Sequence, residues 1–182
     1  MRNCRQMRSI AAEFQTREEE DSLFVEGYFS VFGSVYELWN GASETIAPGA
    51  FSETLDRDIR CLTDHESHLV LGRTKAGTLE LREDEHGLWG RVKINRNDQD
   101  AMNLYERVRR GDVDQCSFGF DILDEETTTT ENGGVRWVIK KVRLYEVSVV
   151  TFPAYEDTAV MARKRDYEEI QKRQTQIWRS NM

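Results

Sequence analysis

A β-prone segment near the end of the chain restricts the fold more than any other part of the sequence. Residues 142–151 hold five aliphatic side chains in ten positions, and Pro153 follows shortly after. β-Branched residues favour strands, and a proline cannot donate to the hydrogen-bond ladder of a sheet. One acid, Glu146, interrupts the run, and a carboxylate there must be ion-paired, hydrogen-bonded or solvated. Because side chains alternate along a strand, Glu146 shares a face with Leu144 and Ser148, and the simplest interpretation is a solvated face.

A shorter run upstream alternates aromatic and small side chains. Phe118 and Phe120 alternate with Ser117 and Gly119, which is the pattern of a strand with one aromatic face buried in the core. Ser117 and Gly119 then share the other face, where the missing side chain of the glycine lets another group approach closely. From these positions alone Ser117 is either a hydrogen-bonded structural serine or a nucleophile, and most serines in strands are structural.

The remaining segments predict one compact α+β domain, because 182 residues are enough for one sizeable core and too few for two. A helix is expected over 98–110, where Asp98 suits the N-cap, arginines occupy the last turn and Gly111 follows. A shorter helix is expected over 50–57, and a long connection over 33–50. Strands are expected over 9–15 and 22–32 as one hairpin, over 59–65, over 77–82 and 88–95 as a second hairpin, and over 135–141 as part of a third.

Composition narrows the functional classes. The net charge of −8 disfavours a general nucleic-acid binder, because an acidic surface repels phosphates. No apolar run is long enough to span a membrane and the N-terminus lacks the core of a signal peptide, so we expect a cytosolic protein. Three cysteines without Cys-x-x-Cys spacing support neither a disulfide framework nor a thiolate metal site.

The last twenty residues differ in charge from the rest. Residues 163–182 carry six basic and three acidic side chains, whereas the preceding residues are strongly acidic. Apolar side chains are sparse there, so we expect a mobile appendage or a helix rather than a part of the core. The chain is accordingly divided into a domain over residues 1–162 and a basic, Gln-rich tail over residues 163–182.

The histidines are the candidate bases and metal ligands. His65 ends an apolar strand-like run, so it can be partly buried and held as a general base, although the residues alone favour a hydrogen-bonded surface histidine. His65 and His68 flank Glu66 next to Asp64, which admits a metal site, but the spacing lacks the helical geometry of a His-Glu-x-x-His motif. His86 lies in a charged turn and is read as solvated. A serine, a histidine and an acid occur by chance in a chain of this size, so the residues alone leave the chemistry open.

Several motifs occur in a specific order along the chain. They are Glu-Thr-Ile-Ala-Pro-Gly-Ala-Phe at 44–51, Asp-His at 64–65, Leu-Gly-Arg-Thr at 71–74, the segment 104–113, Ser-Phe-Gly-Phe at 117–120 and the segment 144–155. With these motifs the chain resembles the prohead (procapsid maturation) serine proteases of tailed bacteriophages, and the resemblance covers residues 9–162. The resemblance implies an endopeptidase inside the immature capsid, which cuts the scaffolding segment from the major capsid protein and usually cuts itself. It also implies a mostly antiparallel β-barrel surrounded by a few helices, similar to the herpesvirus assembly proteases.

The resemblance puts the nucleophile at Ser117, the base at His65 and the orienting acid at Glu146, with Asp64 as the next choice for the acid. In such a triad the histidine takes the serine proton and returns it to the leaving amine, while the acid fixes the tautomer. Cys116 precedes the serine, but neighbouring side chains in a strand face opposite ways, so it is a poor substitute nucleophile. We expect an oxyanion hole near Gly72 and no cofactor or metal.

Partners and alternatives follow from the same resemblance. The expected partner is the major capsid protein with its scaffolding segment. The expected location of the protein is the bacterial cytoplasm, inside the prohead. Whether the chain forms a homo-oligomer is left open. One alternative is a non-catalytic assembly factor of the same fold, suggested by the reversed charge of the tail. The other is a metal-dependent hydrolase that uses His65, His68 and Asp64.

Overall fold

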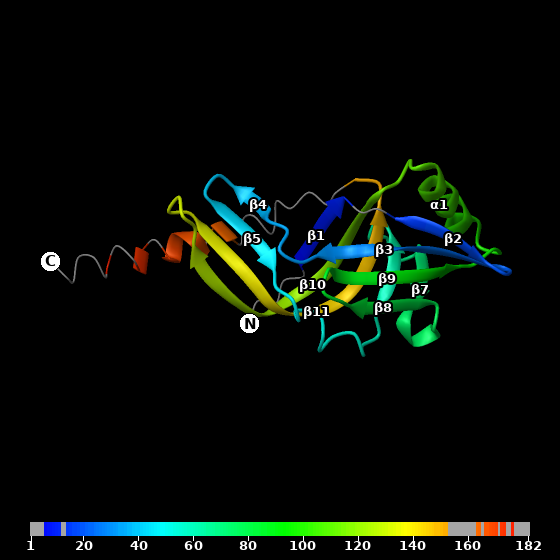
Figure 1. The fold of residues 1–182 in the computed structure, drawn as a ribbon, viewed down its shortest axis with the longest axis horizontal. Helices are drawn as coiled ribbons and strands as arrows, with labels where there is room; N and C mark the ends of the chain where they lie inside the picture. The colour runs from blue at the N-terminus through cyan, green and yellow to red at the C-terminus, as the bar shows by residue number, and fades with distance from the viewer. Residues whose placement is uncertain are drawn as a thin grey trace.

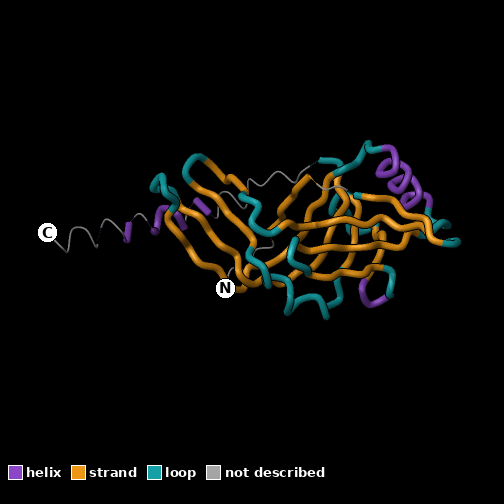
Figure 2. Tube along the Cα trace, viewed as in Figure 1, coloured by secondary structure: helices purple, strands orange, loops and turns teal. Residues whose placement is uncertain are grey.

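The computed structural model describes residues 6–11, 14–152, 163–164, 166–170, 172–173 and 176. Strands dominate this part of the chain and form two sheets (Figures 1 and 2). The first sheet contains β1 (Gln6–Ala11), β4 (Tyr36–Trp39), β5 (Ala42–Ile46), β6 (Arg60–Thr63), β7 (Val70–Arg73), β10 (Gln115–Thr129) and β11 (Val135–Val150). The second contains β2 (Gln15–Glu19), β3 (Ser22–Val31), β8 (Leu79–Glu83) and β9 (Gly87–Ile94), and the helical elements are η1 (Thr74–Ala76) and α1 (Gln99–Arg110).

A long antiparallel hairpin of β10 and β11 organises the first sheet (Figure 1). On its other edge, β11 pairs in parallel with β5 through residues 135–139 and with β6 through residues 146–149. β1 pairs with the free edge of β10. The two strands expected at 135–141 and 142–151 are therefore one continuous strand, whose neighbours come from segments about ninety residues earlier.

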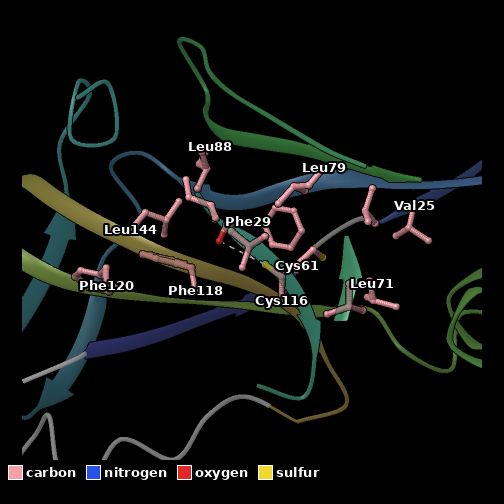
Figure 3. Packing of buried hydrophobic residues seen from close by; sticks show 14 of the residues in the cluster. Val25, Phe29, Cys61, Leu71, Leu79, Leu88, Cys116, Phe118, Phe120 and Leu144 are labelled. Atoms are coloured by element: carbon pink, nitrogen blue, oxygen red, sulfur yellow. Dashed lines mark hydrogen bonds between the residues drawn. The ribbon is translucent and has the colours of Figure 1, made fainter. Parts of the chain in front are cut away.

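The main core lies between the two sheets. The aromatic face predicted for the Ser117 strand is confirmed, since Phe118 and Phe120 are at most 1% exposed and stack with ring centroids 5.0 Å apart. They belong to one cluster with Phe29 and Leu88 from the second sheet (Figure 3). The hydrophobic effect thus holds β10 and β11 against β3 and β9.

The prediction of a mixed fold with mostly strands and few helices is confirmed, but the expected closed β-barrel is wrong. Closure requires every edge strand to find a partner. In the described residues the first sheet ends at β1, β4 and β7, and the second ends at β2 and β8, with no ladder between the two sheets. The long β10–β11 hairpin instead extends beyond the second sheet, and β5 and β4 pair along this extension (Figure 1).

Helix α1 forms as its end signals predict. The Asp98 carboxylate accepts hydrogen bonds from the amides of Asp100 and Ala101, and Gly111 ends the helix in the left-handed conformation. Leu104 and Val108 are buried in the core. None of the helices in the described residues is long and apolar enough to cross a membrane.

Three expectations in the first third of the chain are wrong. β1 ends at Ala11 and joins the first sheet, so the expected strand over 9–15 is split between two sheets. The expected connection over 33–50 contains β4 and β5, whose partner strand β11 is remote in sequence. The expected helix over 50–57 is a series of turns, in which the amides of Ser52, Thr54 and Arg57 each donate to the carbonyl three residues earlier instead of four.

The described residues of the expected tail are helical and contact the body. Arg163 is fully buried and bonds the carboxylate of Glu44 through Nη2 at 2.6 Å and Nε at 3.0 Å. Tyr167 and Ile170 lie against a small cluster around Trp137. A buried cation and two apolar side chains thus connect this segment to the body. The division of the chain at residue 162 stays a prediction.

Candidate active site

The pairing register gathers the predicted site residues on one face of the first sheet. Across β10 and β11, Ser117 lies opposite Ser148, and Gly119 lies opposite Glu146. Side chains directly opposite each other project to the same side of a sheet, so these four residues share the face that is turned away from Phe118. Leu62 of β6 continues the row of Ser117 and Ser148, which brings the end of β6 next to this face.

His65 and Glu146 form a direct pair. The Nδ1 atom of His65 lies 2.8 Å from Oε1 of Glu146, although the residues are 81 positions apart. Glu146 is only 5% exposed, so the expectation that it lies on a solvated face is wrong. A carboxylate in a strand can be buried when partners satisfy it, and here one partner is supplied by the turn that follows β6.

A tight turn after β6 positions His65. Both Asp64 and His65 adopt positive φ values, 49° and 61°, which are uncommon for residues other than glycine. The Asp64 carboxylate accepts from the amide of Thr151 at 2.7 Å, and the Asp64 amide donates to the carbonyl of Val149 at 3.0 Å. The Asp64 side chain therefore fastens the turn to the end of β11, whereas Glu146 is the acid bonded to His65.

Two residues around the Glu146 carboxylate were not assigned a role from the sequence. The Ser148 hydroxyl donates to Oε2 of Glu146 at 2.7 Å, and this serine is fully buried. A Cβ atom on Gly119 would overlap the carboxylate. The sequence predicted a close approach at Gly119, and the approaching group is the carboxylate of Glu146. The position of Ser148 two residues after Glu146 was a usable signal, because such residues share a face of a strand.

Two buried polar atoms at this face lack hydrogen-bond partners within the part of the chain that the structure describes. They are Oγ of Ser117 and Nε2 of His65, and Ser117 is 0% exposed. An unsatisfied buried polar group costs about 1–3 kcal/mol, so native proteins rarely keep one without a use. A serine hydroxyl, an imidazole nitrogen free to accept a proton and a carboxylate on the other imidazole nitrogen suit nucleophilic catalysis.

Cys61 and Cys116 face the core. Sγ of Cys116 lies 3.4 Å from the carbonyl oxygen of Tyr28, on the side of the sheet opposite to Ser117, as alternation predicts. Burial, with smaller contributions from Glu146 and Cys116, raises the pKa of the Cys61 thiol far above its usual range. Thiolate chemistry is therefore disfavoured at Cys61.

The other candidates do not join this group. His68 is largely exposed, with Nδ1 3.6 Å from the Glu66 carboxylate, and no group of three potential metal ligands gathers among the described residues. The expected oxyanion hole near Gly72 stays a prediction. The Arg73 amide there donates to the Thr78 hydroxyl at 2.9 Å.

Comparison with known proteins identifies the family. Residues 11–173 match the caudovirus prohead serine protease family, and the chain belongs to it. The prohead protease of Enterobacteria phage HK97 is 29% identical over 139 residues, which are 76% of this chain and 61% of that protein, so this chain spans about three fifths of its relative's length. The bacteriophage T4 capsid assembly protease aligns with a TM-score of 0.48 and 13% identity, over 83% of this chain and 100% of that one.

Proposed function

We propose that this protein is a serine endopeptidase of phage capsid maturation, with Ser117 as nucleophile, His65 as base and Glu146 as orienting acid. The observation that carries the proposal is the 2.8 Å pair between His65 and Glu146, beside the unsatisfied hydroxyl of Ser117 on the same face. Family membership supports the reaction type. As part of this proposal, the fold is similar to that of the herpesvirus assembly proteases, a similarity that the family resemblance implies.

The proposed reaction is acyl transfer in two steps. With Nδ1–H donated to Glu146, the lone pair of His65 Nε2 takes the Ser117 proton as Oγ bonds to the scissile carbonyl carbon. The proton then passes to the leaving amine as the C–N bond breaks. In the second step a water molecule gives a proton to Nε2 as its oxygen bonds to the acyl carbon. The Nε2 proton then passes to Oγ of Ser117 as the ester C–O bond breaks, which releases the carboxylic acid and restores the hydroxyl. Glu146 stabilises the imidazolium formed in both steps.

The proposed substrate is the scaffolding segment of the major capsid protein, together with the enzyme itself, inside the prohead in the bacterial cytoplasm. This part rests on family membership and on the relative named as a prohead protease. The full burial of Ser117 adds a condition. A peptide reaches the hydroxyl only after a local rearrangement, so we propose that the enzyme is latent until it meets its substrate.

A second candidate is a non-catalytic assembly factor of the same fold, and the zero exposure of Ser117 is the observation that favours it. Co-expression with the capsid protein of the same phage distinguishes the two. The wild-type chain is expected to shorten the capsid protein, whereas Ser117→Ala is expected to leave it intact, because loss of a triad nucleophile costs about 10⁶ in turnover. Trimming by Ser117→Ala at the wild-type rate would refute the assignment.

Matched histidine variants test the base. His65→Ala is expected to be inactive, because His65 is the histidine bonded to Glu146. His68→Ala is expected to keep most of its activity, because the His68 side chain is 73% exposed and pairs with Glu66 instead. A fluorophosphonate should label Ser117 and leave Cys116 unmodified. Equal losses in the two histidine variants would instead favour a metal site.

A further inference from the structure

The environment of the Glu146 carboxylate shows how an acid is held in the middle of an apolar strand. Its Oε1 atom bonds His65, and its Oε2 atom accepts from the Ser148 hydroxyl at 2.7 Å. Ser148 is 0% exposed, so water does not compete for this bond. A carboxylate with both oxygens engaged cannot rotate without breaking one of the two bonds.

Gly119 provides the space for that carboxylate. It lies opposite Glu146 in the β10–β11 ladder, and a Cβ added to it would lie 3.2 Å from Cδ and 3.3 Å from Cγ of Glu146. These separations are shorter than ordinary van der Waals contact, and the clash with Oε1 is closer still. The Glu146 side chain therefore extends across β10, over a position where any other residue would displace it.

We propose that Ser148 and Gly119 are positioning residues that fix the Glu146 carboxylate against His65, an inference that rests on the proposed protease function. Ser148 holds the carboxylate from one side by a hydrogen bond, and Gly119 admits it from the other by having no side chain. Ser148 also lies directly opposite Ser117 in the ladder, so one strand pair sets the spacing of nucleophile and acid. Neither residue touches the reacting atoms; each acts through Glu146.

The chain offers a matched control for each residue. Ser43 is also a buried serine of the first sheet that bonds a charged side chain, Arg136 Nε at 3.2 Å, and it lies on β5. Gly90 is equally crowded, with a Cβ there 2.6 Å from a ring atom of Phe29, but it lies on β9 in the second sheet. Ser43→Ala and Gly90→Ala therefore reproduce the structural disturbance without touching Glu146.

The test compares kcat and KM for capsid-protein cleavage in Ser148→Ala and Gly119→Ala with those of Ser43→Ala and Gly90→Ala. Removal of a residue that orients a catalytic group is expected to lower kcat about ten- to a hundredfold with KM unchanged, as for the outer partners of metal ligands. Ser148→Thr keeps the hydroxyl and is expected to recover most of the lost kcat. Values of kcat in Ser148→Ala and Gly119→Ala equal to those of their controls would overturn the inference.

Two further readouts separate positioning from stability. The low-field proton resonance of the His65 Nδ1–H group is expected to shift or broaden in Ser148→Ala and to stay unchanged in Ser43→Ala. In a Glu146→Gln background, Ser148→Ala is expected to reduce kcat no further, because both substitutions remove the same function. An unchanged resonance, or additive losses in the double variant, would make Ser148 merely structural. Full activity in Ser117→Ala would instead refute the protease assignment itself, so the two failures are distinguishable.

Discussion

Replacing Arg163 by methionine tests whether the C-terminal segment belongs to the folded domain. The guanidinium is fully buried, bonds Glu44 at 2.6 and 3.0 Å, and lies 2.7 Å from the Glu125 carboxylate through Nη1. Its Cζ atom is 4.9 Å from the centroid of the Trp137 ring. Methionine occupies a similar volume but supplies neither the charge nor the donors. The substitution therefore leaves Glu44 buried with one cation fewer.

The expected magnitude follows from these contacts. Removing one partner of a buried ion pair costs about 3–5 kcal/mol, because the remaining charge loses its compensation. Glu44 keeps Arg8 as a second partner, so we expect the lower end, about 3 kcal/mol. For a domain of this size each kcal/mol shifts Tm by about 2–4 °C, which predicts a fall of about 6–12 °C.

Thermal unfolding followed by circular dichroism measures this fall. All chains carry Ser117→Ala, so that none of them cuts itself during the measurement. The control is Arg173→Met in the same segment, where the side chain is 76% exposed and 3.9 Å from Glu169. Exposed pairs contribute about 0–1 kcal/mol, so the control should lose no more than that. If Arg163→Met melts within about 2 °C of the control, the buried cation does not attach the segment, and the reasoning fails.

Three other predictions follow from the same structure. Burial would raise the pKa of Glu44, but the charges and hydrogen bonds of Arg8 and Arg163 outweigh burial and hold the pKa below its ordinary value of 4.5. The stabilisation is therefore complete above about pH 4.5 and lost as the pH falls through the lower folded-state pKa, and urea unfolding between pH 3 and pH 7 should show an acid limb that Glu44→Gln reduces. Asp98→Ala removes the cap of α1 and should lower the unfolding free energy by about 1 kcal/mol in the same assay. Intact-mass spectrometry should find that the active enzyme loses the residues after about 162, whereas Ser117→Ala keeps them; an undiminished mass while capsid protein is cut would contradict self-trimming.

Local signals in the sequence predicted the elements that local contacts determine. Helix α1 begins at a side-chain cap and ends at a left-handed glycine, and both signals lie within the helix's own residues. The alternation around Ser117 predicted an aromatic core face and a close approach at Gly119, and the structure has both. The roles of Ser117, His65 and Glu146 stay predictions that experiment must test.

Pairing between remote segments explains the failures. The sequence around β4 and β5 resembles a connection, because its glycines and serines suit turns, and only the remote strand β11 turns it into sheet. The solvated face predicted for Glu146 is wrong because its partner, His65, is 81 positions away and no local pattern indicates their contact. The prediction of a closed β-barrel is wrong for a similar reason. The residue pattern of a single strand does not indicate whether the two edge strands of a sheet pair with each other.

The parallel pairing of β6 with the last part of β11 also sets the order in which the site can form. His65 emerges from the ribosome long before Glu146, and their pair requires the ladder that residues 146–149 make with β6. Contacts between segments so far apart in sequence form late, because a long loop must close first. A nascent chain that already displays Ser117 and His65 therefore lacks the acid and the strand that hold it. We therefore expect the chain to cleave no neighbouring polypeptide until it has been synthesised through at least residue 150.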